Sequence, residues 1–221
     1  MALTYTQVRE QMVREQLERR GISDPLVLEA MGKVPRHEFV EDALRHRAYE
    51  DNPLPIGEGQ TISQPYMTAL MAETLKLAEG EKVLEVGTGS GYLAAVLAEQ
   101  GVHVCSVEMT DKLAARAQAT LRRLGYESVS VHVGDGTLGW ESEAPYDAIV
   151  IGAAAPCIPR PLLSQLRLGG RLVAPIGEED LQTLVRIWRE PKGLREEYFG
   201  ECRFVKLRGA YGWENWSDSK T

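Results

Sequence analysis

Five short apolar segments alternate with helical patterns between residues 82 and 177, and this alternation restricts the possible folds more than any other feature. The segments are KVLEV (82–86), VHVCSVE (102–108), SVSVHVG (128–134), YDAIVIG (146–152) and GRLVAPIG (170–177). Strands that alternate with helices at this spacing form βαβ units. The sequence therefore predicts an α/β fold, with a doubly wound, mostly parallel sheet and helices on both faces.

The alternation stops after residue 177. Residues 181–190 and 196–207 are strand-like and are joined through Pro191-Lys192-Gly193 without a helix. Two strands joined by so short a connection pair antiparallel. We therefore expect a C-terminal hairpin at the edge of the sheet.

The N-terminal part lacks the alternation of strands and helices. Apolar spacing predicts helices over residues 6–20, from Pro25 to just before Pro35, and over 65–78. Residues 35–57 are rich in proline, arginine and aromatic side chains, and we expect an irregular segment there. This region is predicted to be a helical extension in front of the sheet.

Charge and composition exclude several classes of protein. The net charge is −7, whereas a protein that binds duplex nucleic acid usually needs a basic face. No apolar run is long enough to span a bilayer, and the N-terminus has no apolar signal core. We therefore expect a cytoplasmic protein without a membrane or nucleic-acid partner.

Cysteine and histidine spacing gives no sign of a metal site. The chain has three cysteines, far apart, and no CxxC motif or Cys/His cluster. The four histidines show no ligand spacing and are predicted to be ordinary surface or core residues. We therefore expect neither bound metal nor a disulfide framework.

The segment EVGTGSGY at residues 85–92 lies where the first strand ends and a helix begins, which is where open parallel sheets bind ligands. Dinucleotide sites use GxGxxG, whereas this segment has Gly87, Gly89 and Gly91 in the pattern GxGxG, followed by Tyr92. Glu85 would repel a pyrophosphate. It suits the ammonium and sulfonium groups of S-adenosylmethionine, although a dinucleotide remains an alternative.

Two further acids end the next two strands. Glu108 follows Gly87 by about 21 residues, where an acid accepts hydrogen bonds from ribose hydroxyls. Asp135, in Gly134-Asp135-Gly136, is placed to meet the adenine amino group. Three acids at three consecutive strand ends favour S-adenosylmethionine over a site without a ligand.

The segment GEGQTISQPYM at residues 57–67 offers hydroxyl and amide groups just upstream of this unit. Gly57 and Gly59 are candidate hinges of a closing loop, with a static turn as the alternative. Ser63 is a candidate active-site residue, but a serine before Pro65 is equally typical of a helix cap. Trp140 is predicted to pack either near adenine or in the core.

At these residues the chain resembles the protein-L-isoaspartate (D-aspartate) O-methyltransferase family. VLEAMGKVPRHEFV, AYEDNPLPIGEGQTISQPYM, VLEVGTGSGYLAAVLA, GDGTLGW, APYDAIVIGAAAP and LGGRLVAPIG match the family pattern in order, over roughly residues 6–210. The QTISQPYM and PRHEFV blocks are specific to this family. The resemblance implies a class I methyltransferase, Rossmann-like fold, in a monomer.

The resemblance also implies an activity in protein repair. The family transfers a methyl group from S-adenosylmethionine to the free α-carboxylate of L-isoaspartyl residues, in peptides and in unfolded or aged proteins; the ester then closes to a succinimide. Ser63 matches the family's active-site serine. The cofactor-binding positions are expected to be Gln60, Thr61, Ile62, Ser63, Thr68, Glu85, Gly87, Thr88, Gly89, Gly91, Tyr92, Glu108, Met109, Asp135 and Gly136.

The implied division of the single domain, residues 1–221, is a helical and substrate-loop extension (1–78), a cofactor-binding core (79–177) and a C-terminal hairpin (178–214). Two positions depart from the family pattern. FVKLRG carries Lys206 and Arg208, which leaves open how this segment frames the acceptor peptide, and Gly152 replaces a common threonine.

The expected chemistry needs no general base, because a carboxylate with a pKa near 4 is already ionised at neutral pH. Catalysis then depends on positioning and on exclusion of water. Two alternatives stay open: a methyltransferase with a small-molecule or RNA acceptor, and a cofactor-binding module without catalysis.

Overall fold

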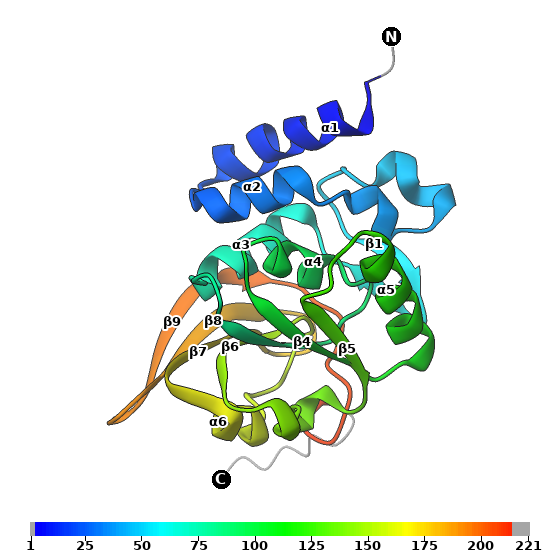
Figure 1. Cartoon of the computed structure of the whole chain (residues 1–221). Coiled ribbons are helices and arrows are strands. Elements are labelled where there is room, and N and C mark those ends of the chain that lie inside the picture. The colour runs from blue at the N-terminus through cyan, green and yellow to red at the C-terminus, as the bar shows by residue number, and fades with distance from the viewer. Residues whose placement is uncertain (1–2, 214–221) are drawn as a thin grey trace.

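A seven-stranded sheet runs through the computed structural model, which describes residues 3–213 (Figure 1). The strand order is β5-β4-β3-β6-β7-β8-β9; β3 to β7 are parallel, and β8 and β9 are antiparallel to their neighbours. The doubly wound sheet and its edge hairpin are therefore confirmed. The strands are β3 (Lys82–Val86), β4 (His103–Glu108), β5 (Val129–Val133), β6 (Tyr146–Ile151), β7 (Leu166–Gly177), β8 (Gln182–Glu190) and β9 (Gly193–Cys202).

Helices cover both faces of the sheet, but unequally. One face packs against α3 (Pro65–Leu75), α4 (Tyr92–Ala98) and α5 (Asp111–Arg123). The helices α1 (Tyr5–Met12) and α2 (Pro25–Lys33) form a further layer outside them (Figure 1). The other face is covered by the short α6 (Arg160–Gln165), by two 3-10 turns, Gly136–Leu138 and Glu141–Glu143, and by loop residues such as Ile158 and Leu207. Successive side chains of each strand point to opposite faces and thus contribute to two separate hydrophobic cores.

The N-terminal helices follow their local signals. α1 (Tyr5–Met12) continues through a π-helical turn and a 3-10 turn to Gly21, whose left-handed backbone (φ 94°) ends the helix as the sequence predicts. α2 (Pro25–Lys33) is capped by Asp24, whose carboxylate accepts from the Leu26 and Val27 N–H groups.

The expectation of an irregular segment up to residue 57 is wrong at its end. β1 (Leu54–Gly57) and β2 (Gln60–Ile62) form a small antiparallel hairpin. Glu58 and Gly59 have φ of 53° and 71°, as a type I′ turn requires. The sequence did not predict this hairpin, because Pro55, Gly57 and Gly59 interrupt the apolar alternation that marks a strand. Its strands are tied to α5, where Arg116 donates to the Ile56 carbonyl.

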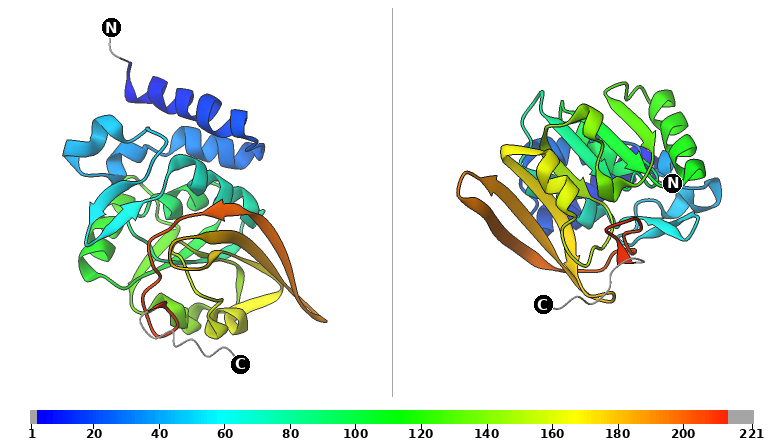
Figure 2. Two further views of the ribbon diagram at one scale, coloured as in Figure 1. Left: turned by 180° about the vertical axis from the view of Figure 1, so that it is seen from behind. Right: turned by 90° about the horizontal axis from the view of Figure 1, so that it is seen from below.

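The chain after β9 crosses the carboxyl ends of the strands, and the strand expected over 196–207 therefore ends at Cys202. Lys206 forms a single parallel bridge with Ala154, and Leu207 N–H donates to the Ala154 carbonyl (2.7 Å). This C-terminal segment lies beside the β1–β2 hairpin (Figure 2). Both segments therefore lie over the edge of the sheet at which the glycine turn sits.

Within residues 3–213, no helix combines the length and the apolar character needed to cross a membrane.

Candidate active site

The glycine turn connects β3 to α4 at the point where the strand order reverses, with β4 on one side of β3 and β6 on the other. Gly87, Gly89 and Gly91 all have positive φ, of 90°, 54° and 86°, which side chains rarely tolerate. Gly91 also allows close helix packing, since a Cβ there would lie 3.2 Å from Leu121. The turn is therefore shaped by its backbone and leaves room at the strand ends for a ligand.

Glu85 is a buried acid with one oxygen available. Its side chain is 1% exposed, and its Oε2 accepts from the Ser106 hydroxyl. Its Oε1 is buried without a hydrogen-bond partner within the protein. Burial, helped by nearby Glu108 and opposed by the Ser106 hydrogen bond, raises the pKa of Glu85 to about 8. A buried acid with an unpaired oxygen fits a cationic ligand, such as the ammonium group of S-adenosylmethionine.

Glu108 is held rigidly at the end of β4. Its two oxygens accept from the Gly89 N–H (2.9 Å) and the Thr110 N–H (3.0 Å), so it also fixes the glycine turn. Each carboxylate oxygen can accept a second hydrogen bond. The remaining acceptor capacity fits the two hydroxyls of a ribose.

Asp135 makes hydrogen bonds within the protein that the sequence did not predict. One oxygen accepts from the Thr137 N–H and hydroxyl, and the other accepts from the Ala210 N–H (2.7 Å) of the C-terminal segment. Gly209 lets the chain approach this closely, since a Cβ there would lie 2.2 Å from the Asp135 carboxylate. The carboxylate anchors the C-terminal segment, and its predicted contact with adenine stays a prediction.

Ser63 is positioned by a buried arginine from the PRHEFV block. Arg36 is fully buried; its Nη2 donates to the Ser63 carbonyl and its Nε to the Ala48 carbonyl, both at 2.7 Å. Its guanidinium lies 4.9 Å from the centre of the Tyr92 ring. Burial lowers the pKa of Arg36 to about 10, so it stays charged at neutral pH. One side chain thus links residues 60–63, called here the acceptor loop, to the first turn of α4.

The helix-cap alternative for Ser63 is wrong. α3 begins after Gln64, and the structure shows no side-chain cap at this helix. The Ser63 side chain is half-buried and borders two adjoining cavities. Its hydroxyl is therefore not used to start the helix.

Three cavities follow one another along this edge of the sheet. The Glu108 cavity includes Gly87, which it shares with the Glu85 cavity. The Glu85 cavity in turn shares Thr61, Ser63 and Gly152 with a groove that reaches the surface. This groove, called here the acceptor groove, is lined by Pro53, Thr61, Ser63, Gln64, Met67, Gly152, Arg203, Phe204 and Val205.

The structure brings most of the predicted site residues together. The Glu108 cavity holds Gln60, Gly87, Glu108, Met109 and Gly136. The Glu85 cavity holds Thr61, Ile62, Ser63, Thr68, Glu85, Gly87, Thr88, Gly89 and Tyr92. Gly91 and Asp135 line neither cavity.

The C-terminal segment contributes residues whose place the sequence left open or did not predict. Lys206 and Arg208, whose part in framing the acceptor was left open, line the Glu108 cavity. Arg203 and Phe204 line the acceptor groove and were not predicted at all. Only the path of the chain after β9 brings them there, so no local sequence pattern marks them.

The fold and the row of cavities together define a class I, S-adenosylmethionine-dependent methyltransferase. The family model described as "Protein-L-isoaspartate(D-aspartate) O-methyltransferase (PCMT)" matches residues 7–211. The chain belongs to this family, and it is therefore an enzyme that uses S-adenosylmethionine.

Relatives and solved structures agree with this assignment. The chain is 54% identical to protein-L-isoaspartate O-methyltransferase 1 of Syntrophobacter fumaroxidans, over 96% of this chain and 99% of the relative. It is 53% identical to the Geobacter metallireducens enzyme, over 96% and 98%. A solved protein-L-isoaspartate O-methyltransferase superposes with a TM-score of 0.84 at 33% identity, over 92% of this chain and 67% of that one.

A second solved structure carries a ligand. It comes from Plasmodium falciparum, is described as a protein-L-isoaspartate O-methyltransferase and was solved in complex with S-adenosyl-L-homocysteine. Its TM-score is 0.77 at 28% identity, over 90% of this chain and 98% of that one.

Replacement of Arg36 tests its link to Ser63. Arg36→Met leaves two buried carbonyls without a donor, at a cost of about 1–3 kcal/mol each. We expect the free energy of unfolding to fall by about 2–6 kcal/mol in denaturant titrations. The control Arg47→Met, at an exposed ion pair with Glu50, should cost under about 0.5 kcal/mol. Equal losses in the two variants would contradict the role of Arg36.

The raised pKa of Glu85 predicts proton release on cofactor binding. Below pH 8 the free carboxyl is mostly protonated, and an adjacent ammonium lowers its pKa, so the proton leaves at pH 7. Calorimetry in buffers of different ionisation enthalpy should show about one more proton released by the wild type than by Glu85→Gln. The difference should vanish well above pH 8. The same release by both proteins at pH 7 would disprove the assignment.

Proposed function

We propose that this enzyme methylates the free α-carboxylate of L-isoaspartyl residues in damaged proteins, at the junction marked by Ser63. One observation carries the proposal: the Glu85 cavity and the acceptor groove share a wall made of Thr61, Ser63 and Gly152. A methyl donor in the Glu85 cavity and a carboxylate in the acceptor groove would meet beside these shared residues. The names of the relatives support the choice of acceptor.

The acceptor carboxylate needs orientation rather than activation. The Ser63 hydroxyl, at the border of both cavities, would donate to one carboxylate oxygen, and backbone N–H groups of the loop would donate to the other. When bound, S-adenosylmethionine supplies an electrophilic methyl group on a positively charged sulfonium. The loop at Ser63 would hold an acceptor oxygen beside that methyl group, so that transfer would yield the methyl ester and release S-adenosyl-L-homocysteine. The resulting ester is activated for succinimide closure by the neighbouring peptide nitrogen.

Charge is distributed to favour this transfer. The loop from Gln60 to Ser63 presents no charged side chain, so it neither pairs with the acceptor carboxylate nor repels the sulfonium. Among the described residues, Arg203 is the one cation that lines the acceptor groove, and its side chain is exposed. Because solvent screens an exposed charge, Arg203 can add a weak attraction for an acidic peptide. The same screening leaves the nucleophilicity of the reacting oxygen unreduced.

The alternatives weighed from sequence have less support. Another acceptor would leave the family-specific loop and its arginine support without a purpose. A binding module without catalysis would not need a groove that adjoins the cofactor cavity through Ser63. Within this proposal, residues 1–78 supply the acceptor loop, 79–177 hold the cofactor, and the following hairpin completes the sheet.

The cellular setting is also part of the proposal. The three free cysteines suit a reducing compartment such as the cytoplasm. Arg195, Glu196 and Glu197 on the edge strand β9 disfavour strand pairing with a second copy, which supports a monomer. The net charge of −7 gives nucleic acid little attraction. Light scattering of the purified chain and cell fractionation test these statements.

Matched peptides test the activity directly. With tritiated S-adenosylmethionine, a peptide with one L-isoaspartyl residue should be labelled, and the same peptide with aspartate should not. Equal labelling, or none, would contradict the proposal.

Ser63→Ala tests the role of the hydroxyl. A hydrogen bond to a charged group contributes roughly 1.5–3 kcal/mol, so kcat/KM for the isoaspartyl peptide should fall at least tenfold while the fold persists. Ser128→Ala, at an exposed serine, is the control. A loss within about threefold would remove Ser63 from the mechanism.

Arg203→Gln tests the charge at the rim of the acceptor groove. Exposed ion pairs contribute roughly 0.2–1 kcal/mol, so KM for an acidic isoaspartyl peptide should rise at most about fivefold at low salt. KM for S-adenosylmethionine and kcat should stay unchanged, and Arg122→Gln on α5 is the control. A change confined to the KM of S-adenosylmethionine would place Arg203 on the cofactor side.

A further inference from the structure

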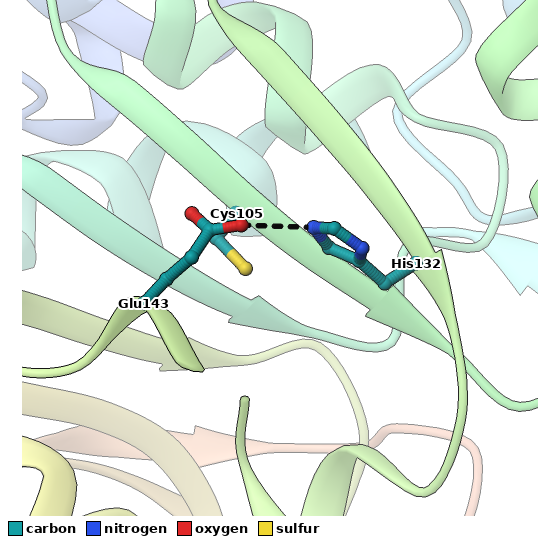
Figure 3. Close-up of side chains that lie close together, drawn as sticks. All are labelled: Cys105, His132 and Glu143. Atoms are coloured by element: carbon teal, nitrogen blue, oxygen red, sulfur yellow. Dashed lines mark hydrogen bonds and ion pairs between the residues drawn. The ribbon is translucent and has the colours of Figure 1, made fainter. Parts of the chain in front are cut away.

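Three side chains with metal-ligating atoms meet on the sheet face covered by α6, outside the row of active-site cavities. They are Cys105 on β4, His132 on β5 and Glu143 at the end of the 3-10 turn Glu141–Glu143 (Figure 3). Their ligand atoms all lie within 4.8 Å of one another, and His132 Nε2 is 3.1 Å from Glu143 Oε1. The sequence showed no such cluster, because the three residues are far apart in the chain.

Strand register explains why the first two residues meet. Cys105 is paired with Ser130, and Val107 with His132, in the parallel β4–β5 ladder. Residues two apart on a strand share a face, so Cys105 and His132 are diagonal neighbours on one face. Their convergence is therefore built into the backbone of the sheet.

Neighbouring aromatic groups hold two of the three residues. Trp140 stacks on the His132 ring, with centroids 4.4 Å apart and an interplanar angle of 20°. The Tyr146 hydroxyl lies 3.5 Å from the Cys105 sulfur and donates to the Trp140 carbonyl (2.7 Å). Contacts of this kind keep ligand side chains in orientation around a metal.

The cluster is closed on one side and open on the other. Cys105 is 1% exposed, whereas the side chains of His132 and Glu143 are 26% and 38% exposed. An ion can therefore enter from the Glu143 side, where a water molecule can complete its coordination.

We propose that Cys105, His132 and Glu143 form a binding site for a Zn²⁺-type divalent ion. Thiolate, imidazole and carboxylate together are typical zinc ligands, whereas Mg²⁺ and Ca²⁺ prefer oxygen alone. Zinc–ligand bonds of about 2.0–2.3 Å place tetrahedral ligand atoms roughly 3.3–3.6 Å apart. His132 Nε2 and Glu143 Oε1, 3.1 Å apart, lie slightly closer than this, and the Cys105 sulfur lies within 4.8 Å of both, so a small movement of the turn that carries Glu143 brings the set around an ion.

Binding exchanges a proton for the metal. Cysteine binds a metal ion as the thiolate, so Cys105 must lose its thiol proton on binding. On binding, the S–H bond breaks, the proton passes to solvent, and the sulfur lone pair forms the bond to the ion. No oxidant or reductant takes part.

The site joins three segments that end near the cofactor. Cys105 is three residues before Glu108, and the loop between His132 and Glu143 contains Gly136 of the Glu108 cavity. A bound ion therefore fixes this loop to β4 and β5. Because the ion binds the native state, it should raise the melting temperature.

Metal titration of the full chain tests the site. After chelator treatment, calorimetry should show one Zn²⁺ bound per chain, and Co²⁺ should give a thiolate-to-metal absorption band. Cys105→Ser should abolish the band, and His132→Gln and Glu143→Gln should each weaken Zn²⁺ binding at least about tenfold. The matched controls are Cys202→Ser, His103→Gln and Glu141→Gln, which should bind as the wild type does.

The outcomes separate this site from the methyltransferase activity. Less than half an ion per chain, equal binding by the His132→Gln and Glu143→Gln variants, or a Co²⁺ band lost in Cys202→Ser would overturn the proposal. If Cys105→Ser fails to fold, the two variants at the part-exposed ligands decide. Labelling of isoaspartyl peptides by the chelator-treated enzyme should persist, so failure of either proposal is seen separately.

Discussion

The buried guanidinium of Arg36 is the interaction on which the active-site arrangement depends. Removal of a charge from water is costly unless hydrogen bonds compensate, and here two backbone carbonyls accept from it while Nη1 has no partner in the protein. The two carbonyls belong to segments 15 residues apart, Ala48 and Ser63. Arg36 therefore fixes the acceptor loop relative to Tyr92 and the glycine turn. Because the buried charge is stabilised only when both carbonyls accept from it, the loop is held in one position.

The two acids of the cofactor site differ because their surroundings differ. Glu85 has a buried, unpartnered oxygen and a raised pKa, so it gains most from a cation. Glu108 has both oxygens occupied by backbone N–H groups and acts as a fixed acceptor at the strand end. Beyond them the loop at Ser63 is uncharged. Acidic side chains are thus concentrated at the cofactor end of the site and are absent from the loop at the acceptor end. This distribution suits transfer to an anionic nucleophile.

Local patterns predicted most of the sheet and failed where long-range contacts decide. The apolar strands, the glycine turn and the helix that begins at Pro25 have their causes within a few residues, and each was predicted. The β1–β2 hairpin was missed because Pro55 and two glycines interrupt the alternation that marks a strand. Arg203 and Lys206 could not be assigned to their cavities, because the path of the chain after Cys202 depends on contacts with Ala154 and Asp135.

The sequence by itself determined the doubly wound sheet, the cofactor turn and, through the QTISQPYM and PRHEFV blocks, the family. These features arise from residue type and short spacing, which act through local backbone preference and strand alternation. Only the tertiary structure decided that Arg36 holds Ser63, that Asp135 anchors the C-terminal segment, and that Cys105, His132 and Glu143 meet. Each of these contacts joins residues separated along the chain, and their distance in space is set by strand register and packing, which no local pattern encodes.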